Sequence, residues 1–250
     1  MRSRYPSASN FSYSFGPGPL TPAIKALIIA NVVAFVITFF APALVLPLGL
    51  RPKDVFGHYA VWQLVTYMFL HAGIGHILFN MLALWMIGVE LERMWGTRFF
   101  TKFYFVCGIG AGLTQVLLGT LPSPFGDQFF YPMTVGASSA IFGLLLAYAL
   151  YFPNRPMLMY FLFPIPAKYF VMILGAIQLL MAAGGGSGVA HTAHLGGIAA
   201  GYLYLKGGRT NLHLLSEIQY RYVKWKINRM RRKFDVYSGG RADDVNRRVH

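Results

Sequence analysis

Long apolar stretches, separated by proline, glycine or charged residues, dominate the chain. A bilayer core about 30 Å thick takes roughly 20 helical residues to cross. Six stretches meet this length, at about 23–40, 75–92, 101–119, 135–152, 160–182 and 189–206. They are continuous instead of alternating with a period of two, which favours helices over barrel strands. The pattern predicts an all-α, polytopic integral membrane protein with six transmembrane helices.

Composition and charge support this interpretation. The 250-residue chain is 56% hydrophobic and 12% charged, whereas soluble domains carry about 25% charged residues. Between Lys102 and Lys206 the only charged residues are Asp127, Arg155 and Lys168. Much of the net charge of +14 comes from residues 206–250, which hold twelve Lys or Arg and four Asp or Glu. These numbers exclude an ordinary soluble domain.

The positive charges also predict an orientation, because Lys and Arg concentrate on the cytoplasmic side. They precede the first stretch, separate the second from the third and the fourth from the fifth, and follow the sixth. We therefore expect a multi-pass protein of a bacterial inner (plasma) membrane, with both termini cytoplasmic. The half-apolar loop 41–74 lies outside and is expected to rest in the membrane interface, although it carries Arg51, Lys53 and Asp54.

Three parts are predicted along the chain: a cytoplasmic lead-in over 1–22, a six-helix membrane domain over 23–206, and a basic cytoplasmic tail over 207–250. Within the tail, residues 210–234 read as a basic helix on the anionic lipid of the inner leaflet. Nucleic-acid binding is the alternative for such a tail, but no recognition motif supports it. Membrane lipids are therefore the expected partners, and nucleic acid is not.

Polar residues of three separate stretches are predicted to lie in one layer. The second, fourth and sixth stretches all run inward from the outer side. His76 and Asn80 lie near the start of the second, Ser138 near the start of the fourth, and His194 about a turn into the sixth. At 1.5 Å per residue, each lies roughly 5–10 Å below the outer surface. Polar groups are costly there, so their clustering indicates a functional site.

A serine and a histidine at one depth indicate nucleophilic catalysis. A hydroxyl attacks a carbonyl when a neutral histidine takes its proton, which makes Ser138 the nucleophile and His194 the base. No Asp or Glu is available at this depth, so a dyad is predicted instead of a triad. Phe142, one turn after Ser138, is placed to stack on the imidazole. Gly197 and Gly201 form a small-xxx-small pair that would let the two helices approach.

Acyl transfer also needs donors for the oxyanion. His76 and Asn80 are spaced i, i+4 and therefore share one helix face. They are predicted as oxyanion donors together with the backbone N–H of Ser138. His71 and His191 are expected to support the site by hydrogen bonding or to lie at its rim. No cofactor or metal is expected, because the histidines have no nearby carboxylates.

Each of these features also has a purely structural interpretation. A serine in a transmembrane helix usually bonds back to a carbonyl or joins two helices, and small-xxx-small pairs mostly serve packing. Histidine and asparagine within a membrane are rarer. The joint pattern, in a consistent orientation, favours catalysis over these separate explanations.

Three motifs resemble those of the rhomboid family of intramembrane serine proteases. Residues 71–80 (HAGIGHILFN) are similar to its H-x4-H-x3-N element, residues 136–143 (GASSAIFG) to its G-x-S motif, and residues 190–197 (AHTAHLGG) to its A-H-x-x-H-x-G-G element. The resemblance spans about residues 23–206. It implies Ser138 as nucleophile, His194 as base, and His76 with Asn80 as oxyanion stabilisers.

The resemblance further implies a six-helix rhomboid-like bundle, a water-filled cavity open to the outside, and substrates that are single-span membrane proteins cleaved near small residues. The glycine-rich segment 184–188 could cap the site. The sequence departs from the family in two places. Ser139 follows the nucleophile where the family commonly has glycine. The pair Trp62-Gln63 occupies the place of a frequent Trp-Arg pair.

The leading hypothesis is thus a serine-type endopeptidase that cleaves in or near transmembrane segments. The alternative is a catalytically weak or inactive rhomboid-like protein that binds membrane helices. A transporter would place ionisable residues along a whole path through the bilayer, which the sequence does not. Zinc and aspartyl intramembrane proteases would need His-Glu-x-x-His or a pair of intramembrane aspartates.

Overall fold

The computed structural model describes residues 16–159, 163–183, 190–207 and 224. The chain divides into two units, Met1–Tyr204 and Leu205–His250, and the fold described below is that of the first. The proposed cap over 184–188 and the basic helix over 210–234 fall on residues outside the described ranges, apart from Lys224.

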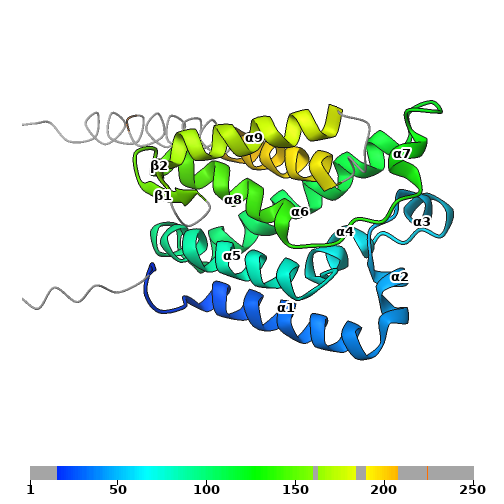
Figure 1. The fold of residues 1–250 in the computed structure, drawn as a ribbon, viewed down its shortest axis with the longest axis horizontal. Helices are drawn as coiled ribbons and strands as arrows, with labels where there is room; N and C mark the ends of the chain where they lie inside the picture. The colour runs from blue at the N-terminus through cyan, green and yellow to red at the C-terminus, as the bar shows by residue number, and fades with distance from the viewer. Residues whose placement is uncertain (1–15, 160–162, 184–189, 208–223, 225–250) are drawn as a thin grey trace, which may run out of the picture. The chain divides into compact units, whose positions relative to one another are not determined.

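The helices and strands follow one another as shown in Figure 1. The longer helices are α1 (Pro22–Phe40), α5 (Ile74–Trp95), α6 (Thr97–Gly119), α8 (Ser138–Tyr151), α9 (Ala167–Ala183) and an unlabelled helix over 190–207. The short elements are η1 (Pro42–Leu44), α2 (Val45–Leu48), α3 (Pro52–Gly57), α4 (Gln63–Thr66), η2 (Tyr67–Phe69), α7 (Asp127–Phe130), β1 (Pro156–Met159) and β2 (Phe163–Pro166).

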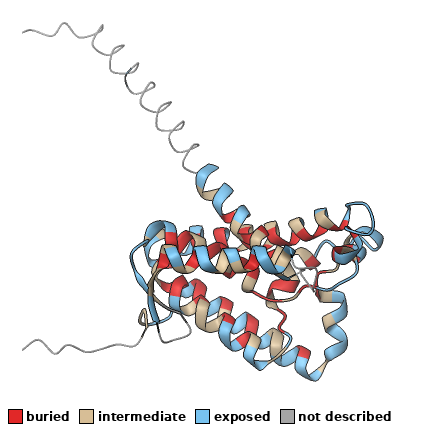
Figure 2. Cartoon of the chain, turned by 45° about the horizontal axis from the view of Figure 1, so that its top comes forward, coloured by how far each residue is buried: buried red, intermediate tan, exposed pale blue. Residues whose placement is uncertain are grey.

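Apolar side chains on the outward faces mark a membrane protein. Helices α1, α5 and α6 are each long and apolar enough to cross a bilayer, and α8 and α9 are shorter apolar helices. In α1 only five of nineteen residues are buried, and large side chains such as Val33, Phe39 and Phe40 are exposed. Figure 2 shows buried residues between the helices and exposed residues on their outer faces. An apolar outer surface of this extent requires lipid around it.

The expected all-α fold is wrong for one small element. Strands β1 and β2 form an antiparallel hairpin in which Pro156 pairs with Pro166 and Met157 with Ile165. The fifth helix was predicted from residue 160, but α9 begins at Ala167. Pro164 and Pro166 explain the difference, because proline lacks the N–H that a helix interior needs. The protein is therefore mostly helical.

The loop over 41–73 folds into short helices at one end of the bundle, and the hairpin lies at the other end (Figure 1). An isolated bridge joins Leu50 to Thr134, so the loop holds the segment that leads into α8. Gln63 stabilises this loop from inside: its side-chain oxygen accepts from the Arg51 N–H at 3.0 Å, and its amide donates to the Pro47 carbonyl at 3.3 Å. The glutamine that departs from the family pattern is thus part of the loop's anchor.

A buried carboxylate joins the start of α1 to the end of α5. Glu92 accepts hydrogen bonds from the backbone N–H groups of Ala23 and Ile24 at 2.9 and 3.1 Å, and from the hydroxyls of Thr21 and Thr97. The first N–H groups of a helix have no partner within it, and the positive end of the helix dipole favours an anion. Glu92 therefore caps α1 from a neighbouring helix.

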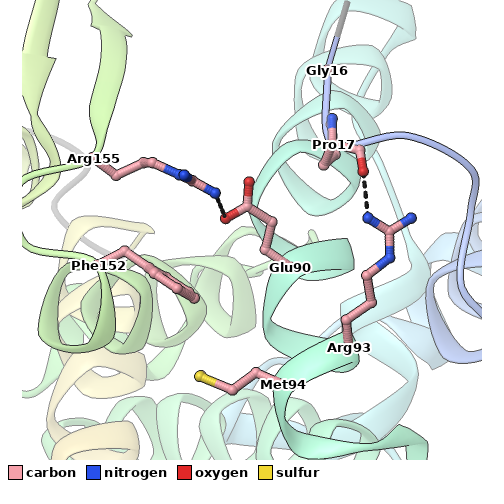
Figure 3. Close-up of a pocket in the computed structure, with 7 residues that line it drawn as sticks. All are labelled: Gly16, Pro17, Glu90, Arg93, Met94, Phe152 and Arg155. Carbon is pink, nitrogen blue, oxygen red and sulfur yellow. Dashed lines mark hydrogen bonds and ion pairs between the residues drawn. The ribbon is translucent and has the colours of Figure 1, made fainter. Parts of the chain in front are cut away.

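A second carboxylate on the same turn of α5 is far less enclosed. Glu90 pairs with Arg155 at 2.8 Å in a pocket that Gly16, Pro17, Arg93, Met94 and Phe152 also line (Figure 3). Arg93 in turn donates to the Pro17 carbonyl at 2.6 Å. The Arg155 side chain is 53% exposed, and such a surface ion pair contributes little to stability. Glu90 is thus a matched control for Glu92.

Replacing Glu92 by alanine should destabilise the protein by at least about 2 kcal/mol, because buried donors lose their acceptor. Glu90→Ala should cost less than about 1 kcal/mol. Thermal unfolding of both variants in detergent micelles measures the difference. Equal losses of stability would contradict the capping role of Glu92.

Candidate active site

Ser138 is the first residue of α8, and the chain enters that helix through a glycine with a special backbone. Gly136 has a φ of +127°, a region that favours glycine. A Cβ there would lie 2.9 Å from the Nε2 and Cε1 atoms of His76 and 3.4 Å from the Ser138 Oγ. The Gly136 N–H donates to the Tyr67 carbonyl at 2.9 Å. Glycine is therefore needed both for the turn and for the close approach of His76.

The structure brings Ser138 and His194 together. The Ser138 Oγ lies 2.7 Å from the Nε2 of His194, although 56 residues separate them in the chain. The Phe142 ring stacks on the imidazole with centroids 4.3 Å apart and planes 14° from parallel. Both Ser138 and His194 are half-buried. This is the geometry of a hydroxyl hydrogen-bonded to a potential base, with the ring held in one plane.

Two glycines of the helix over 190–207 permit this contact. A Cβ on Gly197 would lie 2.0 Å from the carbonyl oxygen of Ser139, and one on Gly201 would lie 3.4 Å from the Cα of Gly143. Gly197 has no room for a side chain next to α8. At Gly201 the distance to α8 is that of an ordinary contact, and the tighter contacts, at 3.1 Å, are with Cys107 and Phe103 of α6. A partly buried hydrogen bond of 2.6 Å from the Gln115 amide to the Thr192 hydroxyl joins the same helix to α6. The helix is thus fixed against α8 and α6.

Gln178 of α9 is a site residue that the sequence reasoning missed. Its side-chain oxygen lies 2.8 Å from the Nδ1 of His194 and 2.7 Å from the Nδ1 of His191. His191 was expected either to support the site by hydrogen bonding or to lie at its rim. It forms a hydrogen bond with Gln178 beside His194. A signal existed in the sequence: Gln178 is the one strongly polar side chain in the apolar run 170–183.

The predicted oxyanion residues lie on the helix that faces Ser138. The Nδ1 of His76 accepts from the Ala72 N–H at 3.3 Å, so a neutral ring carries its proton on Nε2, the atom that approaches Gly136. Asn80 is buried and donates one amide hydrogen to the His76 carbonyl at 2.9 Å. His71 is buried and packs edge-on against His76, with ring centroids 5.0 Å apart.

Ser139, the departure after the nucleophile, is 1% exposed. Its hydroxyl interacts with the phenol of Tyr67, whose own O–H donates to the Gly108 carbonyl at 2.7 Å. The side chain is thus accommodated between α8 and η2.

The assembled groups place a hydroxyl beside an imidazole, with N–H donors nearby. The first N–H groups of a helix have no partner within that helix. Ala137, which precedes α8, provides no side-chain cap for them. Within the residues that the structure describes, no three His, Cys, Asp or Glu side chains come together where they could hold a metal ion. The arrangement suits acyl transfer.

The fold and site define a polytopic membrane protein with a serine–histidine pair between its helices. A family model described as the rhomboid domain matches residues 58–209. Because this match covers more than half of the chain, the protein belongs to the rhomboid family.

Several curated proteins resemble the chain. The rhomboid protease GluP of Bacillus subtilis (strain 168) is 33% identical over 156 residues, which are 62% of this chain and 27% of that protein. The mitochondrial RHOMBOID-like protein 12 of Arabidopsis thaliana is 28% identical over 185 residues, 70% and 55% of the two chains. Rhomboid-like protease 3 of Toxoplasma gondii is 32% identical over 98 residues, 39% and 34%. The chain thus spans about a quarter to about half of the length of these relatives.

The close approach at Gly197 leads to a test. Gly197→Ala should push the helix over 190–207 away from α8, separate His194 from Ser138, and cost about 1–3 kcal/mol of stability. Gly175→Ala on α9 is the matched control, because nothing lies within 4 Å of the added Cβ. Covalent labelling by a fluorophosphonate probe and thermal unfolding measure the two effects. Labelling of Gly197→Ala at the wild-type rate would contradict the packing argument.

Proposed function

We propose that the protein is an intramembrane serine endopeptidase that hydrolyses peptide bonds in or near the transmembrane segments of single-span membrane proteins. The observation that carries the proposal is the 2.7 Å contact between the Ser138 hydroxyl and the His194 imidazole. Family membership and relatives named as proteases agree with it. Ser138 is the nucleophile, His194 is the base, and no cofactor takes part.

The reaction follows from these two groups. The Ser138 Oγ bonds to the carbonyl carbon of the scissile peptide while its proton moves to the Nε2 of His194. The tetrahedral intermediate then collapses, and the imidazolium gives the proton to the departing amine. Water, deprotonated by the same nitrogen, attacks the acyl-enzyme and releases the second product together with the free serine. The stacked Phe142 ring keeps the imidazole in line with Ser138 throughout.

The oxyanion is stabilised by donors from two helices. His76 presents its Nε2–H next to Gly136, and Asn80 has one amide hydrogen left after its bond to the His76 carbonyl. The Ser138 N–H, at the uncapped start of α8, is the third donor. Donors fixed before the reaction lower the energy of the developing charge without reorganisation.

The short α8 supports a submerged site. Fourteen helical residues span about 21 Å, against about 30 Å for the bilayer core. If α8 ends at the inner boundary, near Arg155, then Ser138 lies about 9 Å below the outer surface. Non-helical backbone at that depth is tolerated where protein or water surrounds it. Here the segment before α8 is hydrogen-bonded to protein through the bridge between Thr134 and Leu50.

The position of α8 in the bilayer is consistent with the topology that we propose. Helices α1, α5, α6, α8, α9 and the helix over 190–207 are the six spans of a rhomboid-like bundle covering 23–206, with both termini in the cytoplasm. The lead-in 1–22 and the basic tail 207–250 then face the cytoplasm of a bacterial cell, where the tail meets anionic lipid.

Ser138→Ala and His194→Ala should each lower the cleavage of a single-span reporter in proteoliposomes by about 10³-fold or more, since either change removes the nucleophile or its base. Ser123→Ala and His58→Ala, both at exposed loop positions, are the matched controls and should cleave normally. Cleavage by Ser138→Ala at the wild-type rate would overturn the proposal. Wild-type protein that neither cleaves nor reacts with a fluorophosphonate would instead indicate a binder of membrane helices.

Asn80→Ala should lower kcat by about 10²–10³-fold with little change in KM, because one oxyanion donor acts mainly in the transition state. Asn31→Ala is the control, since that amide donates to the Leu27 carbonyl of its own helix α1. Reporter kinetics in proteoliposomes provide both parameters. An unchanged kcat for Asn80→Ala would remove this residue from the oxyanion site.

A further inference from the structure

A single amide on α9 turns inward from a helix that is otherwise loosely enclosed. Only Ala167, Val171 and Gln178 are buried in α9. Its neighbours Leu179, Leu180 and Met181 are more than half exposed and suit contact with lipid. An amide is costly in such surroundings unless its polar atoms are hydrogen-bonded. The partners of Gln178 therefore indicate its role.

Those partners are two histidines on the next helix. The Gln178 Oε1 lies 2.7 Å from the Nδ1 of His191 and 2.8 Å from the Nδ1 of His194. A carbonyl oxygen has two lone pairs and can accept both hydrogen bonds. The two imidazole rings are nearly perpendicular, with an interplanar angle of 81°. Each ring therefore approaches the oxygen from a different direction.

The proton positions follow from the chemistry of the dyad. A neutral imidazole carries one N–H, and the nitrogen without it is the acceptor. His194 can take the Ser138 proton only if Nε2 is unprotonated, which places the ring proton on Nδ1. The group opposite Nδ1 must then be an acceptor, and the Gln178 oxygen occupies that place.

We propose that Gln178 is the positioning residue for His194: its oxygen fixes the proton of His194 on Nδ1 and that of His191 likewise, leaving the His194 Nε2 free to accept from Ser138. The catalytic part of this inference rests on the proposed protease function. The assignment of the His194 tautomer does not depend on that function. An amide turned by half a rotation would present its N–H₂ to both rings, force the His194 proton onto Nε2, and leave the dyad unable to accept a proton.

The first experiment reads the tautomer without any activity. Protein labelled with ¹⁵N in its histidines is reconstituted in lipid bilayers at a pH where the rings are neutral, and His194→Gln assigns the signal. We expect Nδ1–H for His194 in the wild type and a loss of this preference in Gln178→Met, which is of similar size but has no strong acceptor. Nε2–H in the wild type, or an unchanged tautomer in Gln178→Met, would overturn the proposal.

The second experiment measures reporter cleavage by the same variants. Gln178→Met should lower kcat by about 10–100-fold, in line with the loss of other groups that orient a functional histidine, and leave KM nearly unchanged. Gln178→Glu keeps an acceptor and should recover most of that loss. Leu179→Met, on the exposed face of α9, is the control and should behave as wild type. Failure of Gln178→Glu to exceed Gln178→Met would count against positioning.

The two experiments separate this inference from the proposed function. If Ser138→Ala retained full cleavage while Gln178→Met shifted the tautomer, the protease mechanism would be wrong and the role of Gln178 would stand. If the tautomer were independent of Gln178 while Ser138→Ala was inactive, the reverse would hold. Should Gln178→Met fail to fold, the wild-type tautomer decides alone.

Discussion

The contact of Gly197 with the carbonyl of Ser139 is the constraint on which the rest of the site depends. A side chain at residue 197 would begin 2.0 Å from that oxygen, so the helix over 190–207 can approach α8 only because glycine is present. Interiors are close-packed and cannot absorb such an overlap. The 2.7 Å contact of Ser138 with His194 and the ring stacking on Phe142 both follow from this approach.

Three polar side chains inside the bundle form hydrogen bonds between helices. Glu92 of α5 binds the start of α1, Gln115 of α6 binds Thr192, and Gln178 of α9 contacts His191 and His194. Within lipid, helix association gains little from burial of apolar surface, so close packing and interhelical hydrogen bonds have to position the helices. The same bonds that hold the fold therefore also place Ser138 beside His194.

The sequence predicted the long helices well, because apolar length alone defines them: α1 and α6 end at the expected residues. It misjudged the start of α9, because the apolar residues before it include prolines that belong to a hairpin. It paired Ser138 with His194 through their expected shared depth, and the structure places their side chains 2.7 Å apart. It missed Gln178, since a lone amide in an apolar helix has no partner along its own chain segment, and its acceptor role appears only once α9 lies beside the last helix.

In the mechanism that we propose, an uncharged third group suits a site within a membrane. A carboxylate beside His194 would stabilise the imidazolium more strongly, but desolvating that charge at this depth is expensive. An amide oxygen sets the tautomer at a much smaller cost, because it carries no net charge. Its weaker hold on the imidazolium leaves more of the transition-state stabilisation to the donors around the oxyanion. In that balance His76, Asn80 and the start of α8 matter more than in a site with a charged third member.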